Sequence, residues 1–526
     1  MTVTPAVPPV PGLVVDLRHP RDSSEAALAA LLEVPALADE IGGLFAAAGH
    51  ELHLVGGPVR DLLLGRGGID AAIDGGIVDL DFTTDATPEE IFAVAGGWAD
   101  GSWDVGVRFG TVGLVKHGVR LEVTTFRTEQ YDEDSRKPTV RFGDSLLEDL
   151  TRRDFTVNAM AVSVPGHVFT DPSGGLADLG HRLLRTPGTA EASFSDDPLR
   201  MLRALRFHVT VGLRLAPEVH AALHSLAGRL SIVSPERVRD ELVKILLAPD
   251  PVPALELLVD TGLADVVLPE LPLLRMAQES GRQHKDVYEH SLAVLRRAVE
   301  REPRLPGGGP DLVVRLAALL HDVGKPETRR YDGPSGGVSF HHHETVGARQ
   351  VRRRLRELRF DKATVEAVER LVRLHLRFHG YGSPGSGGTG NEPWTDSAVR
   401  RYVTDAGPLL DRLHALVRSD CTTRNPRKAR DLEAAYQALE DRIAALRQQE
   451  ELAQAARPDL DGDQVQLLLG IDPSRAVGDA LRFLSELKLE RGPLGYAVAA
   501  QELIGWARER GIDPPTRHPT DLPPWE

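Results

Sequence analysis

The sequence predicts an α+β protein in which a small mixed head is followed by a long, almost wholly helical remainder. Short β-like runs (HLVGG, VDLDFTT, VGLVKHG and RLEVTTF) alternate with helical stretches before Pro165. From about Asp196 onward, apolar residues follow helical spacing. The 526 residues are too many for one hydrophobic core, so several domains are expected.

Five segments are expected along the chain. They are a proline-rich disordered segment (1–25), an α/β head (26–165), a helical neck (166–280), a histidine-rich metal-binding domain (281–425) and a helical tail (426–526). Within the head, one helix is expected from Leu28 to Ala48. The glycine-rich runs PGGGP and HGYGSPGSGGTGNEP are expected to be loops, the second one disordered.

Composition excludes several classes of protein. Hydrophobic residues make up 41% and charged residues 26%, which is typical of soluble globular chains. No apolar run reaches the roughly 18 residues of a membrane-spanning helix, so no membrane association is expected. The N-terminus lacks the basic and apolar regions of a signal peptide, and the single cysteine, Cys421, excludes an internal disulfide. A cytoplasmic location is therefore expected.

The net charge of −15 argues against a non-specific coat for nucleic acid. It does not exclude a local basic surface. The stretch from Val346 to Arg377 contains ten Lys or Arg and four Asp or Glu, a net charge of +6. Spread over helices, these side chains either follow an RNA backbone or form a solvated helix face.

Two aspartates mark a candidate catalytic site in the head. Asp79 and Asp81 are two residues apart in a strand-like run, so their side chains point to the same face. Paired carboxylates suit Mg²⁺, which activates an attacking hydroxyl and neutralises a pyrophosphate leaving group. Glu122, in RLEVTTF, offers a third catalytic carboxylate from a neighbouring strand. The alternative is a solvated strand edge.

A glycine turn precedes these aspartates. In VGGPVRD, Gly56 and Gly57 lie between a strand and a helix, where backbone amides can approach a phosphate and Arg60 adds positive charge. Glycines also end strands for steric reasons alone. The combination of GG-x-x-RD with DLDF resembles the polymerase-beta-like nucleotidyltransferase superfamily. This resemblance implies the fold of the head, while the residues themselves indicate Mg²⁺ and a nucleoside triphosphate.

The run RRDFTVNAMA offers further nucleotide-binding groups. Arg153 can reach a phosphate, and Asp154 can accept a hydrogen bond from a sugar hydroxyl. Asn158 lies in the same run and is included in the predicted nucleotide-binding set.

In DDPLRMLRALRF, charged side chains recur every three residues: Asp197, Arg200, Arg203 and Arg206. On a helix this spacing produces a drifting stripe, which a surface ladder of salt bridges explains. The functional alternative is that Asp197 and Arg200 present a carboxylate and a guanidinium to the edge of cytosine or adenine. The other two arginines would then hold the triphosphate.

Taken in order, GGPVRD, DLDF, LEVTTFR, RRDFTVNAMA, DPSGGLADL and DDPLRMLRALRF resemble the bacterial class II CCA-adding tRNA nucleotidyltransferase and poly(A) polymerase family. The resemblance runs from about Leu54 to about Pro269. It departs at Asp196, where the family often has glutamate. It implies that Asp79 and Asp81 are metal ligands and that Gly57, Arg60 and Arg153 contact the nucleotide. It also implies that Asp197 and Arg200 read the base, with Arg203 and Arg206 beside them.

A second constellation lies between His284 and Asp420. A histidine in KDVYEHSL, the HD pair in LLHDVGK and an aspartate in LVRSDC occur in the order of the HD metal-dependent phosphohydrolase superfamily, which they resemble. The resemblance implies divalent-metal ligands at His290, His321, Asp322 and Asp420. His343 and His375 fit as second-metal ligands or phosphate contacts. Imidazole together with carboxylate suits Ni²⁺, Mn²⁺ or Co²⁺.

These resemblances imply that CTP and ATP are added to the 3′ end of tRNA as CCA, with release of pyrophosphate. The tail run GDQVQLLLGIDPSRAVGDALRFLSEL resembles the family's motif that contacts the tRNA elbow. Poly(A) synthesis and A-only or CC-only addition use the same motifs and remain alternatives. So do an HD phosphohydrolase with a nucleotide-binding head and an idle RNA-binding scaffold. The oligomeric state is left open.

Overall fold

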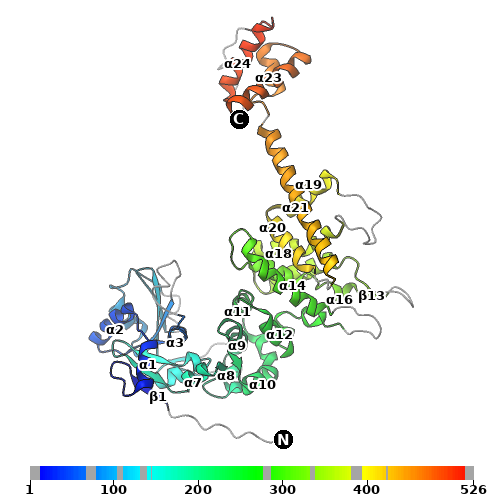
Figure 1. Ribbon diagram of the computed structural model, residues 1–526. Coiled ribbons are helices and arrows are strands. Elements are labelled where there is room, and N and C mark those ends of the chain that lie inside the picture. Colours follow the sequence, from blue (N-terminus) through cyan, green and yellow to red (C-terminus); the bar gives the residue numbers. More distant parts are fainter. Residues whose placement is uncertain are drawn as a thin grey trace. The chain divides into compact units, whose positions relative to one another are not determined.

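The computed structural model describes residues 12–66, 79–103, 110–130, 139–143, 145–276, 286–331, 338–380, 394–421, 425–455 and 457–515 (Figure 1). The predicted α+β class is confirmed. Strands are concentrated in the head, and long helices dominate the rest. Among the described residues, no helix combines the length and the apolar character needed to cross a bilayer.

The head is built on one eight-stranded sheet in the order β1-β10-β9-β2-β3-β6-β5-β4. All neighbouring pairs are antiparallel except β3 and β6, which are parallel. The strands are β1 (Leu13–Asp16), β2 (Leu52–Val55), β3 (Asp79–Thr84), β4 (Gly101–Trp103), β5 (Thr111–Lys116), β6 (Val119–Thr125), β9 (Ala161–Ser163) and β10 (Val168–Asp171). A separate hairpin is formed by β7 (Arg127–Gln130) and β8 (Thr139–Phe142).

Helices pack against this sheet around its central strands. Every residue of β2 is buried. Packed on the strands are α2 (Ala36–Ala48), α3 (Gly57–Leu63) and α5 (Pro88–Ala95). The single helix expected from Leu28 to Ala48 is in fact two, α1 (Ser23–Leu31) and α2, because Pro35 lies between them as the N-cap of α2.

The N-terminal segment is a correction to the prediction of disorder over 1–25. Residues 1–11 lie outside the described residues, but β1 pairs antiparallel with β10, and α1 begins at Ser23. The run LVVD is β-branched and adds an edge strand whose partner is distant in sequence. The predicted end of the head at 165 is also too early. It separates β9 from β10, which are paired in the head sheet.

The neck and the histidine-rich domain are helical. The neck contains α8 (Ala190–Asp196), α9 (Leu199–Thr210), α10 (Pro217–Leu226), α11 (Pro235–Leu246), α12 (Val252–Asp260) and α13 (Ala264–Val267), with a short parallel bridge between β11 (Leu183–Leu184) and β12 (Arg214–Leu215). The next domain packs α14 (Val287–Arg301), α15 (Leu312–Leu320), α16 (Lys325–Thr328), α17 (His343–Glu357), α18 (Lys362–Leu374) and α20 (Leu410–Asp420).

The chain forms two compact units, 1–376 with 408–422, and 377–407 with 423–526. The predicted boundary between 425 and 426 therefore needs correction, because α19 (Asp396–Ala406) belongs with the tail and packs on α21 (Pro426–Ala455). The predicted disordered loop after Phe378 lies largely outside the described residues. At the end of the chain, α22 (Gly462–Leu469), α23 (Arg475–Arg491) and α24 (Gly495–Glu509) enclose a separate apolar core.

A buried arginine of the histidine-rich domain joins that domain to the neck. Arg315, on α15, is 2% exposed and donates from Nε and Nη2 to the two oxygens of Glu302 at 2.6 Å. Its Nη1 donates to the carbonyls of Leu246 and Ala248, at the C-terminal end of α11. These carbonyls have no partner within their own helix, so Arg315 satisfies groups that would otherwise be buried without a hydrogen bond.

We predict that Arg315→Met lowers the free energy of unfolding by about 3–5 kcal/mol, because it leaves the Glu302 carboxylate buried and unpaired. The double variant Arg315→Met, Glu302→Met should recover most of this loss. Urea denaturation followed by circular dichroism measures both. Arg353→Met, on an arginine whose side chain is 65% exposed, is the control and should change stability little. A loss below about 1 kcal/mol for Arg315→Met would contradict the structural role.

Candidate functional site

The predicted catalytic carboxylates lie on adjacent parallel strands. In the register of β3 and β6, Asp81 is opposite Glu122, and Asp79 precedes Asp81 by two residues on the same face. Burial raises the pKa of Asp81 to about 6, and the Glu122 and Asp79 carboxylates add to this, whereas Arg153 opposes it. The three carboxylates are not among the groups of described residues whose ligand atoms all approach within 4.8 Å. Their excess negative charge nevertheless fits a divalent cation.

The glycine turn leaves open space beside these carboxylates. Gly56 has φ +74°, a backbone conformation that favours glycine. A Cβ atom at Gly56 would lie 3.3 Å from Nη1 of Arg153 and 3.7 Å from Oδ2 of Asp81. The absence of a side chain therefore keeps clear a space bordered by one cation and one carboxylate. Gly57 is similarly close to Nη2 of Arg60, at 3.7 Å from its added Cβ.

Asp149 is a site residue that the sequence prediction missed. Its carboxylate is fully buried and accepts hydrogen bonds from Nη2 of Arg152 at 2.5 Å and from Nη2 of Arg153 at 3.1 Å. It also accepts from the hydroxyl of Thr83, on β3, at 3.2 Å. Asp149 thus links the strand of the catalytic aspartates to the arginine beside them. The spacing of three and four residues on helix α6 (Leu146–Thr151) is the signal that could have revealed it.

Two further residues of the RRDFTVNAMA run, Asp154 and Asn158, form a buried network that extends to the neck. Oδ2 of Asp154 accepts from Nε and Nη2 of Arg203, on α9, at 2.8 and 2.6 Å. Its Oδ1 accepts from Nδ2 of Asn158, whose own oxygen accepts from Nη1 of Arg60 at 2.7 Å. Burial alone would raise the pKa of Asp154, but the Arg203 charge and these hydrogen bonds hold it at about 2. Asp154 is therefore a carboxylate already engaged by the protein, rather than one open to a sugar hydroxyl.

The predicted base-reading pair lies at the start of α9. Oδ1 of Asp197 accepts from the backbone amide of Leu199, and its Oδ2 pairs with Arg237, on α11, at 2.8 Å. Arg200 donates to the hydroxyl of Ser193 at 2.8 Å and to the carbonyl of Arg152 at 2.7 Å. Both polar groups are thus oriented by the neck and by the RRD run. Sequence spacing gave no indication of Arg237 or Ser193.

The fourth charged residue of the stripe, Arg206, pairs with the buried Glu241 of α11 at 3.0 Å and lies over the ring of Phe207. Glu241 is also 3.8 Å from Arg203. These charged residues are therefore neither a solvent-exposed row of salt bridges nor a set of arginines that are all free to bind a triphosphate. Arg203 and Arg206 are held within the fold.

The histidine-rich domain brings its predicted ligands together in two trios. One contains His290, His321 and Asp420, and the other contains Asp322 with the two histidines predicted as second-metal ligands, His343 and His375; within each trio the ligand atoms lie within 4.8 Å of one another. Nε2 of His290 is 2.9 Å from Asp420, and Nε2 of His321 is 3.2 Å from Asp322. Asp322 also pairs with Lys325 at 2.6 Å.

Backbone carbonyls orient three of these imidazoles. Nδ1 of His321, His343 and His375 donates to the carbonyls of Ala318, Phe340 and Val372, at 2.9, 2.8 and 2.6 Å. A carbonyl can only accept, so Nδ1 carries a proton in each of them and Nε2 is the nitrogen left for a metal ion. Burial alone would lower the pKa of His321, but the Asp322 and Asp420 carboxylates raise it to about 10, so a metal ion would displace a proton from its Nε2. The three Nε2 atoms are buried and make no well-aligned hydrogen bond among the described residues, although the Asp322 carboxylate lies 3.2 Å from those of His321 and His343. Burial lowers the pKa of His375 to about 3, which keeps it neutral as a metal ligand must be. The residues fit divalent metal.

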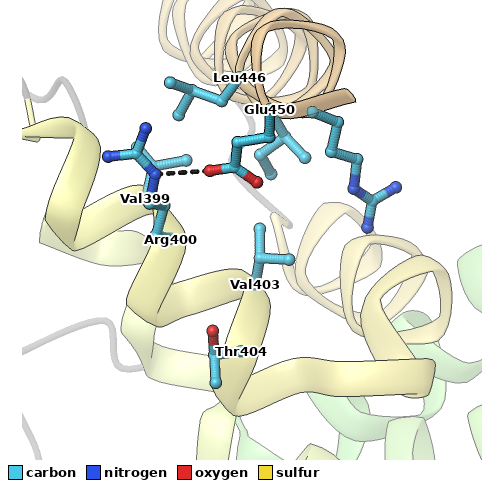
Figure 2. A pocket seen from close by; sticks show the side chains of 8 residues that line it. Val399, Arg400, Val403, Thr404, Leu446 and Glu450 are labelled. Atoms are coloured by element: carbon cyan, nitrogen blue, oxygen red, sulfur yellow. Dashed lines mark hydrogen bonds and ion pairs between the residues drawn. The ribbon is translucent and has the colours of Figure 1, made fainter. Parts of the chain in front are cut away.

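A separate groove lies between α19 and α21 (Figure 2). Its apolar side chains include Val399, Val403 and Leu446, and an ion pair of 2.7 Å between Arg400 and Glu450 borders it. It contains none of the predicted catalytic, nucleotide-binding or metal-binding residues.

Three family models match the chain in sequence order. Residues 52–185 match a poly A polymerase head domain, residues 212–274 a "probable RNA and SrmB- binding site of polymerase A", and residues 287–446 an HD domain. The first contains the carboxylates and the RRD run, and the third contains both histidine trios.

Known proteins agree with these models. An A-adding tRNA nucleotidyltransferase of Deinococcus radiodurans is 37% identical over 373 residues, covering 69% of this chain and 80% of that protein. A CCA-adding enzyme of Geobacillus kaustophilus is 39% identical over 292 residues, covering 53% of this chain and 69% of the relative. A CCA-adding enzyme of Lactobacillus gasseri is 43% identical over 221 residues, which cover 42% of this chain. The chain spans only about half (52%) of the length of that relative.

Solved structures show the same fold. A Bacillus stearothermophilus CCA-adding enzyme in complex with CTP superposes with a TM-score of 0.54 and 27% identity, covering 91% of this chain and 99% of that one. From this similarity of sequence and fold, together with the two sites, it follows that the chain belongs to the bacterial class II tRNA nucleotidyltransferase and poly(A) polymerase family, with an HD domain after its neck.

Proposed function

We propose that this protein adds C, C and A to the 3′ end of tRNA, with CTP and ATP as substrates and pyrophosphate as the leaving group. The observation that carries the proposal is the placement of Asp81 and Glu122 opposite each other on β3 and β6, beside Gly56 and Arg153. The CCA-adding relatives and the CTP-bound neighbour support the choice of substrates.

Each of these residues has a role in the proposed reaction. Asp79 and Asp81 would hold Mg²⁺, which would supply positive charge to activate the 3′-hydroxyl and to neutralise the departing pyrophosphate. Arg153, held in place by Asp149, offers its guanidinium to the triphosphate where Gly56 leaves room. Asp197 and Arg200 face the base. Most of the acceleration then comes from positioning and electrostatic stabilisation.

The test is incubation with tRNA that lacks its 3′ CCA, with CTP and ATP supplied separately and together. The expected result is growth by three nucleotides that requires both triphosphates. Long A tracts from ATP alone would instead indicate a poly(A) polymerase, and no growth under any condition would contradict nucleotide addition.

A-only addition is the second candidate. The Deinococcus radiodurans relative, of which this chain covers 80%, is an A-adding enzyme. In the same assay, an A-adding protein would extend tRNA that already ends in CC by one nucleotide from ATP. It would leave tRNA without any of the CCA unchanged when CTP is supplied.

We further infer that the two histidine trios hold transition metal ions such as Ni²⁺, Mn²⁺ or Co²⁺, because each combines imidazole with carboxylate. Such ions would supply Lewis-acid activation for hydrolysis of a phosphate ester. In that case Lys325, paired to Asp322, adds a positive charge next to the reacting phosphate.

We predict that the Mg²⁺ affinity of the head weakens as the pH falls through about 6. The pKa of Asp81 is raised to about 6, so below this pH a proton occupies the carboxylate, and each unit costs up to about tenfold in affinity. Titration calorimetry between pH 5 and 7.5 measures this in a His321→Ala, Asp322→Ala background, which removes the second site. Glu122→Gln should move the transition to lower pH, since Glu122 raises the pKa. A pH-independent affinity would refute the assignment.

We predict that Asp197→Ala or Arg200→Ala relaxes discrimination against UTP and GTP by about 1–3 kcal/mol, or roughly 5- to 150-fold in relative kcat/KM. Single-nucleotide incorporation with each of four triphosphates measures it. Ser193→Ala, which removes a support of Arg200 and leaves its guanidinium in place, is the matched control with a smaller expected effect. If the rate falls while the order of preference stays the same, both residues are structural.

We predict that His321→Ala, Asp322→Ala protein keeps nucleotide addition within about threefold but loses transition metal binding. The HD ligands lie on or directly after helices of their own domain, α14, α15, α17, α18 and α20, so the head site does not use them. Metal content by mass spectrometry, phosphatase assays with Ni²⁺, Mn²⁺ and Co²⁺, and primer extension give the three readouts. Parallel loss of nucleotide addition in a folded variant would show that the two sites are coupled.

A further inference from the structure

The arginines of α17 fall into two groups that differ in their partners. Arg352 is 3.2 Å from Glu369 of α18, and Arg354 is 3.0 Å from the buried Glu270. These two hold the helix against its neighbours. The others lie on the exposed side and have at most one distant acidic partner.

Three exposed arginines form a stripe. Arg349, Arg353 and Arg356 are spaced by four and three residues, so they share one face of α17 over about 10 Å. Arg353 has Glu357 only at 3.9 Å, and neither Arg349 nor Arg356 has an ion pair within 4 Å among the described residues. The stripe therefore presents positive charge that the fold does not consume, in a chain whose net charge is −15.

Arg359 extends this stripe beyond the helix end. It has φ +60°, a left-handed conformation in which glycine or asparagine is favoured after a helix. Its side chain is 67% exposed, and its acidic neighbour, Glu236, is 3.8 Å away. An arginine at this position costs backbone strain and gains no close ion pair from the fold.

The stripe is continuous with the neck. Nη1 of Arg239, on α11, donates to the carbonyl of Arg359 at 2.6 Å, which fixes α11 beside the end of α17. Helix α11 lies within the segment that matches an RNA-binding region, and its Arg237 pairs with Asp197 of the predicted base-reading pair. Basic residues of α11 therefore contact both the end of α17 and the predicted base-reading pair.

We propose that this surface, Arg349, Arg353, Arg356 and Arg359, binds the phosphate backbone of the RNA whose 3′ end the head extends. The proposal rests on the proposed function for the identity of the RNA. Exposed guanidinium groups at helical spacing suit a polyanion better than an acidic protein surface, since the stripe has no apolar centre of the kind that protein interfaces require.

The test compares wild-type protein with the triple variant Arg349→Gln, Arg353→Gln, Arg356→Gln. Filter binding with tRNA lacking CCA, without nucleotides, gives Kd from 50 to 300 mM salt. We expect about tenfold weaker binding at low salt, and a slope of log K against log salt that is smaller by about 2–3, because each phosphate contact contributes about 0.7–0.9. The KM for CTP and the rate at saturating tRNA should stay unchanged.

The matched control replaces three exposed arginines of other elements, Arg18, Arg296 and Arg304, with glutamine. It changes the net charge equally and should leave the slope within about 1 of wild type. An equal effect of both triple variants, or no change of slope in the stripe variant, would overturn the proposal. The proposal would also be overturned if anionic lipid vesicles bound through the stripe and tRNA did not. Binding is measured without catalysis, so tRNA binding by the stripe can be confirmed even if wild-type protein fails to add CCA. Equally, CCA addition can be confirmed even if the stripe does not bind tRNA.

Discussion

The buried ion pair between Asp154 and Arg203 is the interaction on which the arrangement of the catalytic head depends. It joins the RRD run to α9 through two hydrogen bonds, at 2.8 and 2.6 Å. Breaking such a pair on one side costs about 3–5 kcal/mol, because the remaining charge stays buried. Helix α9 also carries Arg200, which reaches back to the carbonyl of Arg152. The predicted base-reading residues are therefore fixed relative to the RRDFTVNAMA run by contacts that need no substrate.

Asp149 acts on the other side of the same run. Its carboxylate lies between Thr83 of β3 and the guanidinium groups of Arg152 and Arg153. The pKa of Asp149 is lowered: burial would raise it, but the two arginines outweigh that effect. Asp81, by contrast, is buried beside another carboxylate, and its pKa is raised. Two aspartates of one site thus have opposite electrostatic roles. The charge of Asp149 is neutralised by arginines of the fold, whereas that of Asp81 would be neutralised by a bound cation.

Sequence patterns predicted what depends on local spacing. The two-residue separation of Asp79 and Asp81 places them on one face of β3, and helical periodicity identified the long helical region. They could not predict contacts between distant segments. The pairing of Arg237 with Asp197 spans 40 residues and has no local signal. The edge strand β1 was missed for the same reason, because its partner β10 comes more than a hundred residues later.

The two candidate metal sites differ in how their predicted ligands are held. In the head, burial and the neighbouring carboxylates raise the pKa of Asp81, which favours a hard cation as the neutralising partner. In the HD domain, backbone carbonyls hold Nδ1 of three histidines and leave Nε2 as the nitrogen that would bind a metal ion. Beyond the cations that border these sites, such as Arg153 and Lys325, the exposed stripe of α17 carries further positive charge. Since the chain as a whole is acidic, local charge rather than net charge determines which surfaces attract metal ions and which attract RNA.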